Sequence, residues 1–446
     1  MEWGLHVPLR WGRARVHDTT VPIDAPTSGA FCFDTAHMPS VVGGVVDITG
    51  TVGASAITIV DALIAHGYHA QVSDVHIDPT PTHVIVRMRI DGQLSDVYTI
   101  PSTLHTQIIS RIKVLAGLRI DEHMTPHDGR FRTDVASKSG ESVAIDVRVS
   151  ITPTYYGENA VLRLLIKTNA IRTIDDLGLS ARDRGEIDRA LAQPYGLIIV
   201  TGPTGSGKTT TLYTLLERLN TPDVSIVTLE DPIEYAIPNV RQIQINPATG
   251  FTFGTGLRSV VRQDPDIVMV GGIRDTETAR LAINTALTGH LVLTTLHTND
   301  AVGCITRLID MGVEPYLISS TVCVVVAQRL LRRVCGGCVQ KYEMSVENRQ
   351  VISKIIPELV IGLYAHCYKG RGCGECRGTG YRGRNGVYEL LSIDEHMRSL
   401  ITARHGEAEI RMYAATQGSR PIVHDAYDKS CRGITSIQEV MRLHHE

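Results

Sequence analysis

The stretch GPTGSGKT at residues 202–209 decides the fold, because it matches the phosphate-binding pattern GxxxxGK[ST] at every fixed position. The apolar run GLIIV (196–200) precedes it, and the helix-forming stretch TTTLYTLLERL (209–219) follows it. A strand, a glycine-rich turn and a helix in this order form a phosphate-binding loop (P-loop), whose N–H groups converge on a nucleotide such as ATP. We expect the loop to be formed by Gly202, Pro203, Thr204, Gly205, Ser206, Gly207, Lys208, Thr209 and Thr210.

Two of these residues have individual roles. Lys208 is expected to reach the β- and γ-phosphates of the nucleotide, and Thr209 is expected to hold Mg²⁺. The flanking strand and helix are the context that the motif requires, so a chance glycine-rich turn is a poor explanation.

Downstream of the P-loop, three more short apolar runs alternate with helical stretches. The runs are SIVTL (225–229), DIVMVG (266–271) and LVLTTL (291–296). Continuous apolar strands separated by helices predict a parallel sheet covered by helices on both faces, and hence an α/β fold. Acidic residues and His297 come at the ends of these runs, where a parallel sheet forms its ligand crevice.

The part before the P-loop has a different pattern. Residues 1–53 lack periodicity, and we expect an irregular arm. Ile57, Val60 and Leu63 have helical spacing, whereas the stretch 82–100 alternates and turns at an Asp-Gly pair. These patterns predict a small α+β domain ahead of the nucleotide-binding domain.

Several motifs in fixed order give the chain its resemblance to a known family. After the P-loop come TLEDPIEY (228–235, the Asp box), DPDIVMVG (264–271), TGHLVLTTLHTND (288–300, the His box) and two CxxC pairs. Together these motifs resemble the type II secretion and type IV pilus assembly ATPases, also called traffic ATPases, over about residues 55–446.

The residue patterns and this resemblance together predict a division of the chain into six parts. They are an irregular N-terminal arm (1–53), an α+β domain (54–168), a linker (169–180), a RecA-like ATPase core (181–330), a tetracysteine zinc subdomain (331–386) and a helical C-terminal region (387–446).

The resemblance also implies a mechanism and partners. The family works as homo-hexameric rings that drive filament assembly through an inner-membrane platform protein. Its N-terminal domain supplies arginines to the nucleotide, and here the local motifs point to Arg130, Arg148 and Arg163. Glu230 and His297 are the expected catalytic residues of the two boxes. A guanidinium stabilises the charge that spreads over a transferring phosphoryl group.

One position departs from the family pattern. The stretch VGGIRD (270–275) has Gly272 where the family has the Walker B glutamate. A glycine does not orient or activate the attacking water, and loss of a positioned base typically lowers a rate by ~10² to 10⁴-fold. Binding should persist, since the P-loop is intact. Slow hydrolysis, or replacement of the lost carboxylate by Glu230 or, less plausibly, Glu277, remain alternatives.

The cysteines predict a metal site. Of nine cysteines, Cys335, Cys338, Cys373 and Cys376 form two CxxC hooks. Four thiolates suit a structural, tetrahedral Zn²⁺ site. Cys367 and His366 are nearby alternatives outside a hook. The family's retraction-type members lack this knuckle, so its presence favours an assembly or secretion role.

The composition argues against a membrane-spanning protein and against a nucleic-acid motor. No apolar run reaches the length of a membrane helix, and the N-terminus lacks a signal-peptide core, which predicts a cytoplasmic protein bound to the inner membrane face only through partners. The net charge of −3 and the 5% aromatic content argue against a nucleic-acid motor. Two hypotheses remain, an ATP-hydrolysing motor and a nucleotide-gated structural subunit with little turnover, and Gly272 separates them.

Overall fold

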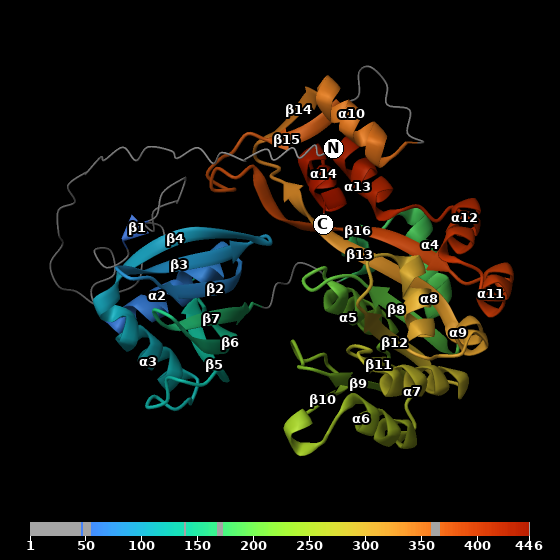
Figure 1. The fold of residues 1–446 in the computed structure, drawn as a ribbon, viewed down its shortest axis with the longest axis horizontal. Coiled ribbons are helices and arrows are strands. Elements are labelled where there is room, and N and C mark those ends of the chain that lie inside the picture. The colour runs from blue at the N-terminus through green and yellow to red at the C-terminus, as the bar shows by residue number, and fades with distance from the viewer. Residues whose placement is uncertain (1–45, 48–54, 138–139, 167–172, 358–365, 446) are drawn as a thin grey trace, which may run out of the picture. The chain divides into compact units, whose positions relative to one another are not determined.

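The computed structural model describes residues 46–47, 55–137, 140–166, 173–357 and 366–445. Their strands form two seven-stranded sheets and one two-stranded sheet (Figure 1). Among the helices of these segments, none combines the length and apolar character needed to cross a bilayer.

The first sheet belongs to the α+β domain. Its elements are β1 (Val46–Asp47), α2 (Ala56–Ala70), β2 (Val72–Pro79), β3 (His83–Ile90), β4 (Gln93–Pro101), α3 (His105–Leu115), β5 (His127–Ala136), β6 (Ser142–Thr154) and β7 (Gly157–Leu165). The strand order is β1-β4-β3-β2-β7-β6-β5, and all pairs except β1–β4 are antiparallel. The helices α2 and α3 pack against the face that buries alternate residues such as Val147 and Val149.

The structure bears on two expectations for this domain, the turn between β3 and β4 and the N-terminal arm. The expected turn between β3 and β4 is present, with Asp91 and Gly92 both at positive φ, +49° and +86°. Within the arm that we expect to be mostly irregular, Val46–Asp47 form a short strand that pairs in parallel with Tyr98 and Thr99 of β4. The rest of residues 1–53 lies outside the described residues.

The second sheet carries the P-loop. Its elements and those around it are α4 (Ala181–Leu191), β8 (Gly196–Thr201), α5 (Lys208–Leu219), β9 (Ile226–Glu230), β10 (Arg241–Gln244), α6 (Phe253–Val260), β11 (Ile267–Val270), α7 (Thr276–Leu287), β12 (Leu291–Leu296), α8 (Ala301–Asp310), α9 (Pro315–Thr321) and β13 (Val322–Val334). The C-terminal elements are β14 (Val339–Glu343), α10 (Val346–Ile355), β15 (His366–Gly370), β16 (Tyr381–Ser392), α11 (Glu395–Thr402), α12 (Glu407–Thr416), α13 (Ile422–Cys431) and α14 (Ile437–His445).

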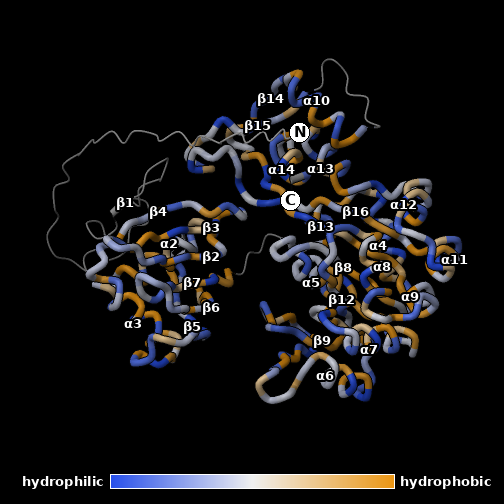
Figure 2. The backbone as a smooth tube through the Cα atoms, in the orientation of Figure 1, coloured by the Kyte–Doolittle hydropathy of each residue, from blue (hydrophilic) through white to orange (hydrophobic). Residues whose placement is uncertain are grey.

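The order of the second sheet, β10-β9-β11-β12-β8-β13-β16, confirms the predicted α/β fold. All pairs are parallel except β13–β16 at one edge. Each central strand buries side chains on both faces, so β8 sends Leu197 and Ile199 to the helices α6 to α9, and Ile198 and Val200 to α4 and α5. Figure 2 shows the apolar residues concentrated along these central strands.

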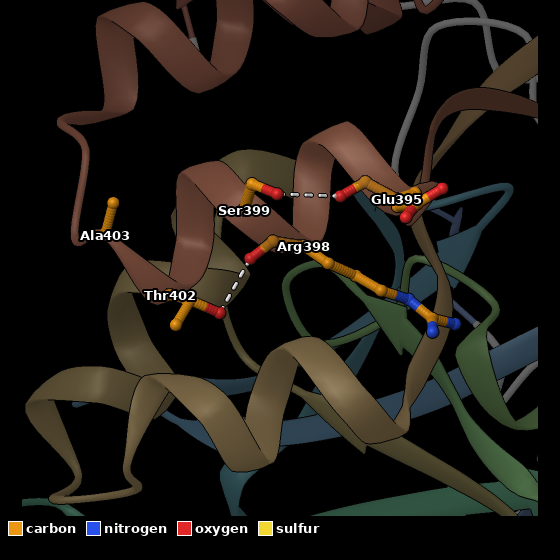
Figure 3. A pocket seen from close by; sticks show the side chains of 5 residues that line it. All are labelled: Glu395, Arg398, Ser399, Thr402 and Ala403. Carbon is orange, nitrogen blue, oxygen red and sulfur yellow. Dashed lines mark hydrogen bonds between the residues drawn. The ribbon is translucent and has the colours of Figure 1, made fainter.

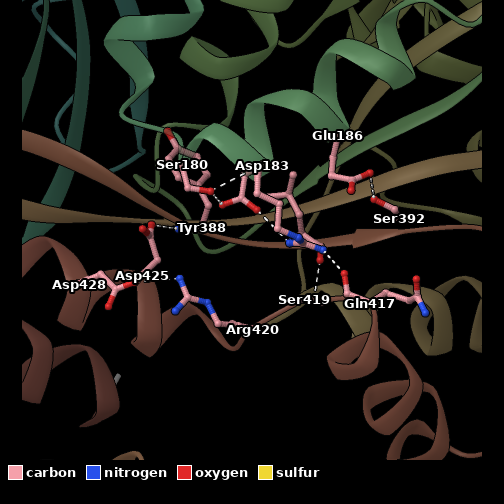
Figure 4. A network of polar contacts seen from close by, with 12 residues as sticks. Ser180, Asp183, Glu186, Tyr388, Ser392, Gln417, Ser419, Arg420, Asp425 and Asp428 are labelled. Carbon is pink, nitrogen blue, oxygen red and sulfur yellow. Dashed lines mark hydrogen bonds and ion pairs between the residues drawn. The ribbon is translucent and has the colours of Figure 1, made fainter. Parts of the chain in front are cut away.

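The strands β13 and β16 cross the expected subdomain boundaries. β13 continues to Val334 and β16 begins at Tyr381, so the expected start of the helical region, residue 387, lies inside a strand. A polar network anchors the C-terminal helices on β16: in Figure 4 the Asp425 carboxylate accepts a hydrogen bond from the Tyr388 N–H. The same carboxylate also accepts from Lys429. Strand pairing with β13, rather than local propensity, decides this assignment.

Residues of the expected linker also pack. Within it, Ile174–Leu177 form a short 3₁₀ turn, and the side chains of Ile174 and Leu177 are buried in the core beside α5. Residues 169–172 lie outside the described residues.

Candidate nucleotide site

The P-loop connects β8 to α5 along a path that only glycine permits. Gly202 has φ of +146° and Gly207 has φ of +87°, a backbone region that side chains rarely adopt. A Cβ atom at Gly202 would lie 2.4 Å from the carbonyl oxygen of Gln328, and one at Gly207 would lie 2.8 Å from the Gln328 Nε2 atom. The sequence pattern thus reflects both the loop's dihedral angles and its close approach to β13.

Lys208 stands at the start of α5 with its charge largely shielded from solvent. Its Nζ atom donates to the carbonyl oxygens of Gly202, at 2.8 Å, and Pro203, at 2.9 Å. Burial and the nearby positive charge of Arg329 lower the pKa of Lys208 to about 8. No carboxylate within the described segments forms an ion pair with it, so a bound phosphate would supply the missing counter-charge.

Ser206 is a second feature of the loop that fits an anionic ligand. Its hydroxyl oxygen is buried and has no hydrogen-bond partner among the described residues. Buried polar atoms are nearly always paired, and an orphan at a loop of N–H groups suits a ligand oxygen. The loop and the start of α5 therefore form a cradle for the phosphates of a nucleotide.

A small cavity of about 50 Å³ lies beside this cradle, at the carboxyl ends of the strands. Its lining brings the P-loop, β9 and β11 together: Thr209, Leu212, Glu230, Asp231, Pro232, Glu234, Phe253, Met269, Gly271 and Arg274. The space suits a few water molecules, and its hydroxyl and carboxylate oxygens are ligands that Mg²⁺ prefers. Thr209 and the Asp-box carboxylates would hold the ion, which would neutralise charge on the transferring phosphate.

Glu230 is held by three neighbouring side chains. It is the last residue of β9, is 2% exposed, and accepts hydrogen bonds from the Tyr213 and Thr228 hydroxyls. Gln242 on β10 donates to its Oε1 atom at 3.1 Å. Burial and the Glu230 carboxylate raise the pKa of Tyr213, which keeps this donor protonated. These three donors fix the orientation of the Glu230 carboxylate.

Gly272 follows β11 and has room for a side chain. A Cβ atom there would meet only the Thr295 Oγ1 atom, at 3.3 Å, and its φ lies outside the positive region. Gly271 differs, because its Cβ would lie 3.1 Å from the Leu229 carbonyl oxygen. The backbone angle does not require glycine at 272, and a Cβ there would need only the Thr295 side chain to shift by a few tenths of an ångström. Glu277, the less plausible substitute, pairs with Arg258 at 2.5 Å and does not line the cavity.

The two histidines of the His box lie at opposite ends of β12. His297 follows the carboxyl end of the strand, and partial burial together with the charges of Lys208 and Arg274 lowers its pKa. The imidazole is therefore neutral at neutral pH beside two cations. His290 precedes the strand, and its Nδ1 atom lies 3.0 Å from the Thr285 carbonyl oxygen at the end of α7.

The three arginines predicted from separate motifs form one row across the first sheet. Arg130 on β5 is directly opposite Arg148 on β6, and Arg148 is directly opposite Arg163 on β7. Residues directly opposed on adjacent strands point to the same face. Arg163 in turn is opposite Asp74 on β2, which ends the row with a carboxylate.

The arginines of this row differ in their partners. Arg163 donates to Asp74 at 2.8 Å, and Arg148 donates to the Ile233 carbonyl oxygen and to Glu234, both at 3.2 Å. Arg130 is exposed. Arg148 thus contacts the Asp box directly, whereas Arg163 contacts a residue of its own domain.

The four hook cysteines converge on one point. Their sulfur atoms all lie within 4.8 Å of one another, and three of the pairs, 335–373, 338–376 and 373–376, are 3.7 to 3.8 Å apart. A tetrahedron of sulfurs at the Zn–S distance of ~2.3 Å has edges of ~3.8 Å. Burial raises the pKa of the Cys376 thiol, but N–H groups of Cys373 and Gly380 outweigh it and lower that pKa to about 6. The four residues therefore fit zinc.

The tetracysteine cluster closes the excursion between β13 and β16. The first hook follows Val334, and the second precedes Tyr381. The alternative ligands His366 and Cys367 lie on β15 opposite β14, and Cys367 is buried in a separate apolar cluster with Ile352. They are not part of the four-sulfur group.

A larger hollow of about 480 Å³ lies along α11 (Figure 3). Its lining comes from this one helix and the residue that caps it: Glu395, Arg398, Ser399, Thr402 and Ala403. The hydroxyls of Ser399 and Thr402 bond to carbonyl oxygens one turn earlier. Without converging groups from other elements, it is a surface depression.

Some residues of the site carry no motif that the sequence analysis used. Tyr213 and Gln242 orient Glu230, and Gln328 contacts the P-loop. A signal was present for Gln328 alone, since it is a polar residue directly after the apolar run 322–327.

Comparison with known proteins agrees with this geometry. The profile of the family described as "Type II/IV secretion system protein" matches residues 52–442. The Type II secretion system protein E of Pseudomonas aeruginosa is 44% identical over 393 residues, which cover 88% of this chain and 76% of that protein. The Type II secretion system ATPase E of Vibrio cholerae is 43% identical, with coverage of 88% and 76%. The Type IV pilus assembly ATPase PilB of Thermus thermophilus is 44% identical over 87% of this chain, but over only 43% of its own length.

Solved structures share the fold. The Legionella pneumophila ATPase DotB superposes with a TM-score of 0.63 at 20% identity, covering 88% of this chain and 96% of that one. The pilus retraction motor PilT with bound ADP superposes with a TM-score of 0.58 at 23% identity, covering 86% and 96%. With the family profile and relatives of 43 to 44% identity, the chain belongs to the type II/IV secretion system protein family and is a P-loop ATPase.

Proposed function

We propose that this chain is the ATP-driven motor subunit of a type II secretion or type IV pilus assembly machine. The observation that carries the proposal is Lys208, an ammonium group buried in a glycine-lined loop with no carboxylate partner among the described residues. Names of the relatives support the two machines, one as secretion system ATPase and one as pilus assembly ATPase.

Each site residue then has a chemical role. The nine P-loop residues bind the phosphates, and Thr209 holds Mg²⁺ together with Asp-box oxygens. Glu230 orients the attacking water, and His297 responds to the γ-phosphate. The row of Arg130, Arg148 and Arg163 offers guanidinium groups to the charge that develops during transfer. ATP supplies the phosphoryl group, and Mg²⁺ neutralises the negative charge on that group.

The oligomer and partners follow the family. We propose a homo-hexameric ring that acts at the cytoplasmic face of the inner membrane through a platform protein and binds no nucleic acid. The four cysteines hold a structural Zn²⁺ ion that ties β13 to β16. The expected domain scheme assigns the arginines to residues 54–168 and the P-loop to residues 181–330.

Gly272 makes the hydrolysis of this subunit slow. The position follows a strand that ends beside the cavity, and its backbone angle does not require a glycine. The missing carboxylate lowers turnover by ~10² to 10⁴-fold relative to a protein with glutamate. Among the described carboxylates that line the cavity, Glu230 alone is buried, and it is the candidate for residual activity.

The test is a paired measurement of ATP affinity and steady-state hydrolysis with Mg²⁺. The unaltered chain is compared with Gly272→Glu, with Gly272→Gln as the uncharged control of similar size. We expect equal ATP affinity and a turnover that rises at least 10-fold only in the glutamate variant. Equal turnover in all three proteins would mean that Glu230 suffices, and failure of the unaltered chain to bind ATP would refute the motor function.

A second function is favoured by the same glycine. In this alternative the subunit binds ATP, closes and holds the nucleotide as a structural or regulatory member of the machine. It predicts tight ATP binding with no turnover above the Lys208→Ala background, and full assembly activity in the presence of a nonhydrolysable ATP analogue. Measured turnover that tracks assembly would reject it.

A further inference from the structure

The strand β13 runs directly beside β8, the strand that leads into the P-loop. Val326 is opposite Val200, and Ala327 is opposite Thr201. The next residue on each strand is Gln328 and Gly202, so Gln328 comes level with the first residue of the P-loop. This neighbourhood depends on the strand order of the sheet and is invisible in the P-loop motif.

Gln328 contacts the P-loop at its start, at its end and in the following helix. Its side chain is 2% exposed, and its Oε1 atom accepts a hydrogen bond of 2.7 Å from the Thr211 hydroxyl on α5. Its Nε2 atom lies against Gly207, and its carbonyl oxygen lies against Gly202. The buried residue Gln328 therefore contacts both the first part and the last part of the P-loop.

Arg329 extends these contacts to the His box. Its Nη1 atom would lie 3.2 Å from a Cβ at Gly202, and it donates to the Gln328 carbonyl oxygen at 3.2 Å. Its Nη2 atom donates to the Asn299 carbonyl oxygen at 3.0 Å. The Thr201 hydroxyl accepts from the Thr298 N–H at 2.9 Å, so the loop after His297 is held at two points.

We propose that Gln328 is a positioning residue for ATP binding: it holds the P-loop in its phosphate-binding shape, and Arg329 connects that shape to the loop that carries His297. The proposal rests on ATP binding at the P-loop, as proposed above. A loop that is held before the nucleotide arrives loses less conformational entropy on binding, which raises affinity. Arg329 also places a second positive charge near Lys208.

The first experiment measures ATP affinity directly for Gln328→Met and Thr211→Val. Methionine keeps the length of the side chain and removes both polar atoms, whereas valine removes the hydroxyl that binds Gln328. The matched control is Thr214→Val, on the same helix, because the Thr214 hydroxyl donates to the Thr210 carbonyl oxygen at 2.9 Å and does not contact Gln328. We expect affinity to fall about 10-fold in the first two variants and less than 2-fold in the control.

The double variant Gln328→Met/Thr211→Val separates positioning from general damage. Since both changes break the same hydrogen bond, their effects on affinity should be markedly less than additive. KM for ATP should rise while kcat changes less than 3-fold, because Gln328 positions the P-loop for ATP binding. Additive effects, or affinity within 2-fold of the unaltered chain, would overturn the proposal.

A second variant keeps the test informative if the methionine variant does not fold. Gln328→Glu retains the acceptor for Thr211 but places a negative charge beside Gly207, and it should weaken ATP binding at least 10-fold. Arg329→Gln should weaken it as well, whereas Arg333→Gln, an exposed arginine on the same strand, should not. Unchanged ATP affinity in Gln328→Glu would overturn the positioning role of Gln328. Failure of the unaltered chain to bind ATP would instead refute the proposed function.

Discussion

The Tyr213 hydroxyl donates a hydrogen bond to the Glu230 carboxylate, and both side chains are shielded from solvent. Tyr213→Phe should lower the free energy of unfolding by about 1 to 3 kcal/mol, because a buried carboxylate loses a donor. It should also lower kcat more than it raises KM, since Glu230 would no longer be fixed. Denaturant titration and steady-state kinetics measure both effects. The control is Tyr235→Phe, whose ring packs on Tyr213; equal behaviour of the two variants would contradict the argument.

The arginine row predicts a strong effect of charge removal at two positions. In a Gly272→Glu background, Arg148→Gln and Arg163→Gln should each lower ATP turnover at least ~10-fold, as expected for arginines that stabilise phosphoryl transfer. Arg132→Gln is the matched control, because Arg132 forms an exposed ion pair with Asp146 on the same sheet. A comparable loss in the control would show that the sheet, rather than the row, is responsible.

The buried pair of Asp425 and Lys429 predicts a large stability effect. Both side chains are nearly inaccessible, and Lys429 also donates to the Gly386 carbonyl oxygen at 2.6 Å. Asp425→Asn leaves the lysine charge without a counter-charge and should destabilise the protein by about 3 to 5 kcal/mol. Asp428→Asn, which breaks the exposed pair with Arg420 in the same network (Figure 4), should cost less than about 1 kcal/mol. Thermal denaturation distinguishes the two, and equal losses would refute the prediction.

His66 predicts an acid-sensitive step in the α+β domain. Burial, reinforced by the charge of Arg377, lowers its pKa to about 4, and its Nδ1 atom lies 2.7 Å from the Tyr98 hydroxyl. The unfolded chain takes up a proton near pH 6.5, whereas the folded domain resists until pH 4. The contribution of His66 to the free energy of unfolding is therefore fully present above pH 6.5. It is lost as the pH falls toward 4, by about 3 kcal/mol at most.

The variant His66→Gln should flatten this pH dependence. Glutamine does not titrate and retains an acceptor for Tyr98. Between pH 7.5 and pH 5, the unfolding temperature of the variant should change little, whereas that of the unaltered chain should fall. His396→Gln, an exposed histidine, is the control and should leave the profile unchanged. A profile in the His66 variant as steep as that of the unaltered chain would assign the effect to another group.

The tetracysteine cluster predicts one zinc ion per chain. Cys376→Ser should abolish zinc binding and lower the unfolding temperature, because a metal that binds only the folded hooks stabilises them. Chelation of the unaltered chain should have the same effect. Cys431→Ser, at an exposed cysteine outside the cluster, should retain the metal, as measured by elemental analysis. Zinc in both variants would exclude these four ligands.

The sequence alone determined those features that depend on residues close together in the chain. The P-loop, the apolar strands β8, β9, β11 and β12, and the hooks were predictable because glycine dihedral angles, burial and thiol spacing are local properties. The same logic failed at residues 387–392, where pairing with β13 continues a strand into the expected helical region.

The tertiary structure alone decided which of these features meet. The register of β5, β6 and β7 aligns Arg130, Arg148 and Arg163, although each comes from a different motif. The sheet order places Gln328 beside Gly202, more than a hundred residues earlier in the chain, and brings Tyr213 to Glu230. Strand order and register arise from burial and hydrogen bonding between distant segments, and no local pattern specifies them.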